Sequence, residues 1–236
     1  MAYTNSSLVS YKKISPNKTV NRNHKIDTIT IHHMAGNLTV EQCGEVFAPA
    51  SRKASSNYGI GSDGRIGMYV EEKDRSWATS SSANDHRAIT IEVANDNTKS
   101  WTISQKAYDS LVKLCVDICK RNGITELRWK GDKNLIGKVE QQNMTVHRWF
   151  AATLCPGDYL YNLHSQIAKD VNAKLKKSAP KKLERGNDII WELMNGKYKV
   201  QIDDVDSAVK ALDKAKEHPE FMRLYWILYK VVNGNG

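Results

Sequence analysis

Hydrophobic and polar positions repeat with two different periods along the chain. Alternating positions rich in β-branched residues predict strands at residues 25–36 and 87–96. Residues 56–72 show the same alternation on both sides of a Ser-Asp-Gly sequence, which predicts a hairpin with its turn at that point.

Other segments repeat their apolar positions every three to four residues, as amphipathic helices do. Residues 39–48 begin with a threonine N-cap followed by glutamate, residues 104–123 begin with serine and end at glycine, and residues 159–177 continue the same spacing. The order strand, helix, hairpin, strand, helix predicts the α/β class, with a mixed central β-sheet flanked by helices.

The pattern breaks near the C-terminus. Proline, glycine and clustered charges at residues 177–187 are typical of a linker. We therefore expect a large domain at 1–176 and a small helical C-terminal domain at 188–236, which serves wall targeting or oligomerisation. Several aromatic residues of this small domain fit either its core or a wall-binding face: Trp191, Tyr198, Tyr225, Trp226 and Tyr229.

The net charge of the chain favours anionic partners. It has 35 Lys and Arg against 26 Asp and Glu, a formal net charge of +9, which attracts nucleic acid, anionic membranes and anionic wall polymers alike. The sequence has no aromatic-rich RNA motif, concentrated basic helix or zinc-finger spacing, so we expect no nucleic-acid partner.

The sequence offers no apolar run of about 18 residues that would span a bilayer, so we expect no membrane insertion. Residues 1–20 lack the apolar core of a secretory signal. We expect synthesis in the cytoplasm, and a substrate outside the cell would be reached after release through a holin or by lysis.

The four cysteines lack the spacing of a disulfide-rich scaffold. Cys115 and Cys119 lie on the apolar stripe of the helix predicted at 104–123, which favours a place in the core. Cys155 differs, because it follows His147 by eight positions and precedes a Pro-Gly turn. With His32 of the first strand, these residues offer two imidazoles and one thiolate, and three protein ligands with a fourth position open to water describe a catalytic zinc site.

Four motifs, in this order, resemble one family: ITIHH, NYGIGSDG, ITIEVAND and HRWFAATLCPG. Over residues 25–175 the chain is similar to the phage lysozyme-type N-acetylmuramoyl-L-alanine amidases and the peptidoglycan recognition proteins. The resemblance implies a zinc-dependent endolysin or autolysin that hydrolyses the amide bond between N-acetylmuramic acid and L-alanine in bacterial peptidoglycan. The alternative is a recognition module that binds peptidoglycan without cutting it, although such members typically lose the thiolate ligand.

The resemblance also assigns roles to single residues. His32, His147 and Cys155 match the ligands of one Zn²⁺ ion, whereas His33 points to the other face of its strand and is expected to be a packed or outer-sphere histidine. Glu92 matches the general base, and its apolar strand neighbours predict a raised pKa.

Two further catalytic positions follow from the same comparison. Tyr58 matches a tyrosine whose hydroxyl lies near the metal, and Thr153 stands where some relatives have a lysine that stabilises the tetrahedral intermediate. A threonine supplies a hydrogen bond but no positive charge. Four positions match residues that line the substrate groove, with structural roles equally open: Trp77, Asn84, Arg87 and Trp149.

Overall fold

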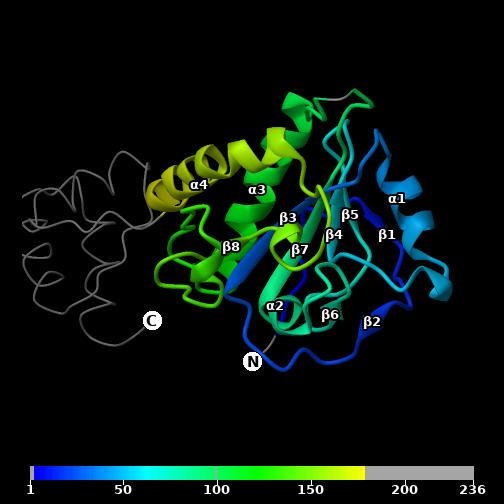
Figure 1. The fold of residues 1–236 in the computed structure, drawn as a ribbon, viewed down its shortest axis with the longest axis horizontal. Helices are drawn as coiled ribbons and strands as arrows, with labels where there is room; N and C mark the ends of the chain where they lie inside the picture. Colours follow the sequence, from blue (N-terminus) through cyan, green and yellow to red (C-terminus); the bar gives the residue numbers. More distant parts are fainter. Residues whose placement is uncertain (1–2, 99, 179–236) are drawn as a thin grey trace, which may run out of the picture. The chain divides into compact units, whose positions relative to one another are not determined.

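The computed structural model describes residues 3–98 and 100–178, which fold around a six-stranded sheet (Figure 1). The strand order is β1-β5-β4-β7-β3-β8, and only the β4–β5 pair is antiparallel. The strands are β1 (Tyr11–Lys12), β3 (Thr28–His33), β4 (Tyr58–Ile60), β5 (Ile66–Met68), β7 (Ala88–Val93) and β8 (Met144–Thr145). A separate antiparallel pair joins β2 (Lys18–Thr19) to β6 (Arg75–Ser76).

The helices are α1 (Val40–Phe47), α2 (Ser82–Arg87), α3 (Gln105–Arg121) and α4 (Asp158–Ser178), with short 3-10 turns η1 (Ala50–Arg52), η2 (Lys133–Leu135) and η3 (His147–Trp149). This arrangement confirms the predicted mixed sheet flanked by helices. The predicted hairpin is the β4–β5 pair, and the two predicted long strands are β3 and β7.

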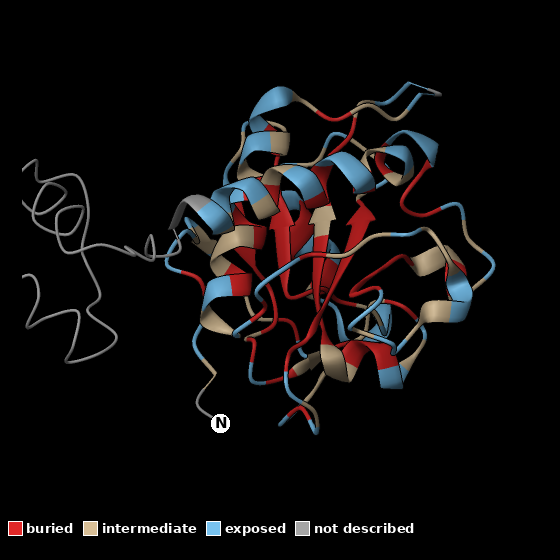
Figure 2. Cartoon of the chain, turned by 90° about the vertical axis from the view of Figure 1, so that its left-hand side faces the viewer, coloured by how far each residue is buried: buried red, intermediate tan, exposed pale blue. Residues whose placement is uncertain are grey.

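Strand alternation gives the sheet one apolar face. Ile29, Ile31, Ile89 and Ile91 are fully buried on this face, in one cluster with apolar residues of α3 and α4. In Figure 2 the strands are mostly buried, whereas the helices beside them expose their outer sides. The two helices therefore cover the apolar face, whereas on the opposite face polar side chains extend from β3 and β7 and α1 packs beside β5.

The opposite face is buried but polar. Thr30 of β3 exchanges hydrogen bonds with Thr145 (2.7 Å) and Asn84 (3.1 Å), and Thr90 of β7 bonds to Ser76 (2.8 Å). These bonds satisfy buried polar groups, as a low-dielectric interior requires. They also fix the strands whose next outward-facing residues on this side are His32 and Glu92.

Local sequence signals explain where the helices begin. The Thr39 side chain accepts from Gln42 N while Gln42 reaches back to Thr39 N, which is the capping box predicted for α1. Ser104 caps α3 through a single bond, in which its side chain accepts from Ala107 N. Cys115 and Cys119 are fully buried on the inner side of α3, so the predicted core role of these thiols is confirmed.

The predicted linker and C-terminal helical domain lie almost entirely outside the described residues. α4 extends to Ser178 and thus includes the first two residues of the segment expected to be linker. Among the described residues, no helix has the length and apolar character needed to cross a membrane.

Candidate metal centre

Three chain segments bring the predicted ligands together. His32 lies at the carboxyl end of β3, His147 opens the η3 turn directly after β8, and Cys155 lies in the turn that leads into α4. Because β8 pairs with β3 in parallel, both histidines emerge at the same edge of the sheet. The site is therefore assembled by strand pairing between residues far apart in the sequence.

The three side chains are close enough to share one ion. One ligand atom from each of His32, His147 and Cys155 lies within 4.8 Å of the others. Cys155 Sγ is 3.4 Å from His32 Nδ1, and the two imidazole centroids are 5.1 Å apart. Zinc–nitrogen and zinc–sulfur bonds of about 2.0–2.3 Å place tetrahedral ligands about 3.5 Å apart, so this geometry fits zinc.

An unpartnered buried atom supports the same interpretation. Glu92 Oε2 belongs to the carboxyl group beside His32 and is buried without a hydrogen-bond partner. Orphaned buried polar atoms are destabilising and call for an absent partner such as an ion or water. The His/His/thiolate donor set, near this atom, is the chemistry that zinc prefers.

Burial shifts the pKa of all three side chains. It favours the neutral imidazoles that bind a metal, but it disfavours the thiolate. It lowers the pKa of His32 well below 6.5, with further lowering from the neighbouring His147 and His33, and it lowers the pKa of His147 as well. Both imidazoles are therefore neutral at pH 7, ready to donate a lone pair. Burial raises the pKa of the Cys155 thiol, so thiolate formation here requires a nearby cation.

Glu92 lies beside these ligands because β7 pairs with β3 in register at this level. Glu92 is the direct partner of His32, and its Oε1 is 3.9 Å from His32 Nδ1. Burial raises the pKa of Glu92 to about 8, opposed by the positive charge of Arg52. The raised pKa expected from the sequence is confirmed, and it suits a group that takes and returns a proton near neutral pH.

A pocket of about 250 Å³ contains these groups. Thr153 and Trp77, two of the predicted site residues, both line it. Thr153 Oγ1 accepts from Cys155 N at 3.2 Å, so the hydroxyl lies beside the sulfur ligand. The Trp77 indole donates to Thr19 Oγ1 at 2.9 Å, which holds the ring in the pocket wall.

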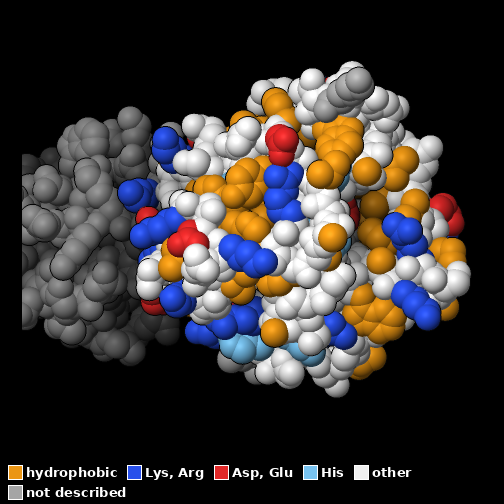
Figure 3. Space-filling view, viewed as in Figure 1, with side chains coloured by type: hydrophobic (Ala, Val, Ile, Leu, Met, Phe, Trp, Pro, Cys, Tyr) orange, Lys and Arg blue, Asp and Glu red, His pale blue; other side chains and the backbone are white. Residues whose placement is uncertain are grey.

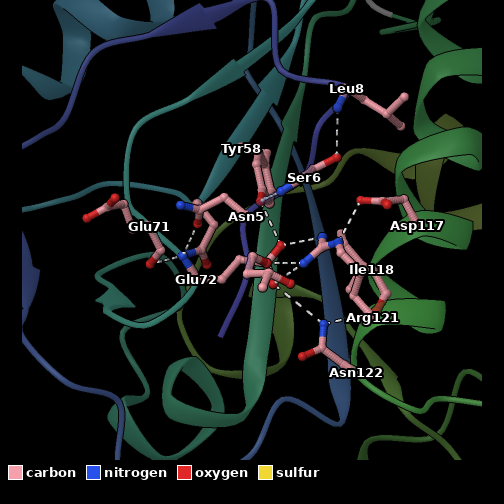
Figure 4. Close-up of polar contacts among 12 residues, drawn as sticks. Asn5, Ser6, Leu8, Tyr58, Glu71, Glu72, Asp117, Ile118, Arg121 and Asn122 are labelled. Atoms are coloured by element: carbon pink, nitrogen blue, oxygen red, sulfur yellow. Dashed lines mark hydrogen bonds and ion pairs between the residues drawn. The ribbon is translucent and has the colours of Figure 1, made fainter. Parts of the chain in front are cut away.

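Tyr58 does not reach this pocket, and its predicted catalytic role is corrected. Its partner on β7 is Ile91, whereas Gly59 is the partner of Glu92, so Tyr58 faces the apolar side of the sheet. Its hydroxyl donates to Glu72 Oε1 at 2.6 Å and accepts from Ser6 N at 3.0 Å (Figure 4). Tyr58 is therefore part of a buried polar network behind the sheet.

Three predicted substrate-binding residues also have structural partners instead. Asn84 is buried and bonds to Thr30 and Thr145, so it supports the strands beneath the site. Arg87 forms a bidentate ion pair with Asp27 at 2.7 and 3.0 Å. Trp149, 8 % exposed, stacks on Trp129 with ring centroids 5.1 Å apart. None of these three lines the pocket, and their contacts favour the structural alternative; a contact of any of them with substrate stays a prediction.

Sequence reasoning missed much of the pocket wall. The wall includes one basic residue and several apolar ones from α1 and the turns around it: Arg52, Leu38, Cys43, Val46 and Phe47. The amphipathic helix at 39–48 was visible in the sequence, but the part of its surface that faces the site depends on its packing against β5 and β1. In the orientation of Figure 1, hydrophobic and basic side chains are interspersed on the visible face of the molecule (Figure 3).

Comparison with known proteins identifies a family that matches this chain. The sequence profile of the family described as N-acetylmuramoyl-L-alanine amidase matches residues 22–158, more than half of the chain. No curated protein matches the chain significantly.

Solved structures share the fold. The structure of a PlyL mutant is similar with a TM-score of 0.52 and 13% identity, over 69% of this chain and 98% of that one. A selenomethionine derivative of AmpD gives 0.51 and 15% identity, over 71% of this chain and 99% of that one. At these identities the likeness concerns the fold alone.

Proposed function

The chain belongs to the N-acetylmuramoyl-L-alanine amidase family, and from this premise we propose that it is a zinc-dependent enzyme of bacterial peptidoglycan. Its substrate bond is the amide that joins the lactyl group of N-acetylmuramic acid to the L-alanine of the stem peptide. The observation that carries the proposal is the convergence of His32, His147 and Cys155 beside the buried carboxyl group of Glu92.

The ligand set favours catalysis over a purely structural metal. Three protein ligands leave one position of a tetrahedral ion for water or substrate, whereas structural zinc takes four. When bound, zinc supplies a Lewis acid that activates water and polarises an amide carbonyl. His32 and His147 would hold the ion as neutral imidazoles, and Cys155 would hold it as a thiolate.

Glu92 is the proposed proton carrier. Its raised pKa, about 8, means that its carboxylate takes up a proton readily once formed. In the proposed reaction Glu92 accepts the proton of the attacking water and then donates it to the alanine nitrogen as the amide bond breaks. The carboxylate is regenerated in the same turnover.

Thr153 is the proposed donor to the developing oxyanion. It lines the pocket beside Cys155, and its Oγ1 already accepts from Cys155 N, so its hydroxyl hydrogen can donate to substrate. Arg52 contributes a positive charge to the wall that counteracts the effect of burial on Glu92.

Purified cell walls provide the direct test. We expect the zinc-loaded protein to release new N-terminal L-alanine without new reducing sugar ends. Release of reducing ends alone would indicate a glycosidase. Tight wall binding with no release of either group would support the recognition module instead, and would contradict the proposed hydrolysis.

A further inference from the structure

A second hollow opens beside the metal pocket, on the other side of the turn that carries Cys155. Its volume is about 490 Å³, within the roughly 300–1,000 Å³ typical of ligand sites. The two hollows share this turn as their partition: Thr153 and Cys155 line the metal pocket, and Leu154 and Gly157 line the second one. A ligand that crosses the partition would therefore occupy both.

Trp101 forms a wall of this second hollow and is held there by strained backbone. Its φ of +48° lies in the left-handed region, which is unusual for a bulky residue. The Asp96 carboxylate fixes the loop, because it accepts from Thr98 N (3.0 Å), Thr98 Oγ1 (2.7 Å) and the Thr102 hydroxyl. The position of the indole is thus imposed by the fold.

Close packing also holds the Trp101 ring from below. The indole packs against His33 with ring centroids 4.7 Å apart, and His33 lines the metal pocket. Gly157 lies under the six-membered ring, since a Cβ added at Gly157 would approach Trp101 Cε3 to 2.8 Å. The half-buried indole therefore bridges the two hollows with a fixed orientation.

Polar and apolar groups surround the indole. Asn97, Thr98 and Ser100 contribute amide and hydroxyl groups. Arg148 also lines the hollow, but its guanidinium is paired with the Asp158 carboxylate at 2.9 Å, so the charge of Arg148 is compensated. Leu154, which is 68 % exposed, contributes an apolar side chain to the hollow. An aromatic platform ringed by short hydrogen-bonding side chains suits a pyranose, which has apolar C–H faces and hydroxyl edges.

We propose that this second hollow, the Trp101 hollow, binds a hexosamine of the glycan strand while the stem peptide occupies the metal pocket. The proposal rests on the proposed function, because the scissile amide joins sugar to peptide and must have each on one side of the metal. The metal pocket, with its apolar wall from α1 and the positive charge of Arg52, suits a peptide that carries carboxylates. The Trp101 hollow is then the site that remains for the sugar.

Binding of glycan strands stripped of stem peptides tests this assignment without any hydrolysis. We expect the zinc-loaded full chain to bind such strands in calorimetric titration, and Trp101→Ala to weaken binding at least tenfold. Leu154→Ala, at a side chain too exposed to affect folding, should weaken it severalfold. Trp77→Ala, a matched removal of an indole from the metal pocket, should leave glycan binding within twofold.

On intact walls, Trp101→Ala should raise KM with kcat little changed, since the lost contact binds substrate and transition state alike. Equal glycan binding by the wild-type protein, Trp101→Ala and Leu154→Ala would overturn the assignment even if the walls are cut. Absence of L-alanine release by the wild-type protein would instead contradict the proposed function. The glycan titrations would still show whether the Trp101 hollow binds sugar.

Discussion

Glu92 holds a carboxyl group where burial opposes its ionisation. Its side chain is 16 % exposed, one of its oxygens is without a hydrogen-bond partner, and its other oxygen lies 3.9 Å from His32, one of the proposed zinc ligands. A buried ionisable group of this kind lowers the stability of the fold but can serve catalysis. A substitution at this position should therefore separate the two effects.

We predict that Glu92→Gln abolishes most of the activity, at least 100-fold, because general acid–base catalysis contributes about 10²–10⁴-fold. The same change should stabilise the metal-free protein at pH 8. The folded pKa of about 8 exceeds the ordinary 4.5, so folding takes up a proton between these values and stability falls as pH rises through them.

The expected gain is about 4 kcal/mol at pH 8 and close to zero at pH 4.5. Chemical denaturation of both metal-free proteins at the two pH values measures it. A gain that is the same at both pH values would argue against an ionisation effect.

At the residue scale the sequence predicted that His32, His147 and Cys155 lie together, as they do, but it misplaced Tyr58. The proposed ligand set follows from residue type, spacing and the family resemblance, which need no knowledge of strand pairing. The face on which Tyr58 lies depends on the β4–β7 register, in which Gly59 rather than Tyr58 meets Glu92. This register is a non-local property, and a shift of one residue reverses every side chain of the strand.

Among the elements, the η3 turn depends on one arginine. Arg148 N donates to Cys155 O at 3.1 Å, and the guanidinium donates to Leu154 O (2.6 Å) and Asp158 Oδ1 (2.9 Å). These bonds join the turn that carries His147 to the turn that carries Cys155. Arg148 therefore acts as a positioning residue for two ligands.

We predict that Arg148→Met lowers zinc affinity about 10–100-fold, as loss of outer-sphere support does at other zinc sites. Competition with a chelator measures the affinity. Arg87→Met is a matched control, because it also removes a guanidinium from an ion pair but lies outside the pocket lining. An equal loss of affinity in both variants would show that the effect comes from general destabilisation.

The polar network around Glu72 connects three other elements. The buried Glu72 carboxylate accepts from Tyr58 of β4 and from Arg121 of α3 at 2.6 Å each, and Glu72 N donates to Asn5 Oδ1 at 2.9 Å (Figure 4). The network thus ties the N-terminal segment and α3 to the sheet. Its contribution should be to stability alone.

We predict that Tyr58→Phe lowers the free energy of unfolding by about 1–3 kcal/mol, because Glu72 loses a buried donor. The kcat on cell walls, measured well below the melting temperature, should stay within twofold of the wild-type value. A tenfold drop in kcat without loss of stability would restore the catalytic role that the sequence suggested for Tyr58.

For the whole molecule, the sequence predicted the layered α/β architecture because long amphipathic segments dominate it. It did not predict the short strands β1, β2, β6 and β8, which have only two residues each and are defined by their partners rather than by their own pattern. β8 nevertheless matters most for the site, because it places His147.

The C-terminal residues carry a separate prediction about wall targeting. We expect a fusion of residues 183–236 to a fluorescent protein to decorate bacterial cells with little dependence on salt, because this segment has 8 Lys and Arg against 9 Asp and Glu. Microscopy at low and high salt measures this. Failure to decorate cells, together with dimerisation of the fusion in solution, would favour the oligomerisation alternative.

The central claim is that two imidazoles and one thiolate hold a catalytic zinc ion, and metal analysis coupled to wall hydrolysis tests it most directly. We predict one zinc per wild-type chain with L-alanine release, loss of both in Cys155→Ser, and retention of both in Cys119→Ala, whose thiol lies in the core. A Cys155→Ser protein that keeps stoichiometric zinc and full activity would contradict the account.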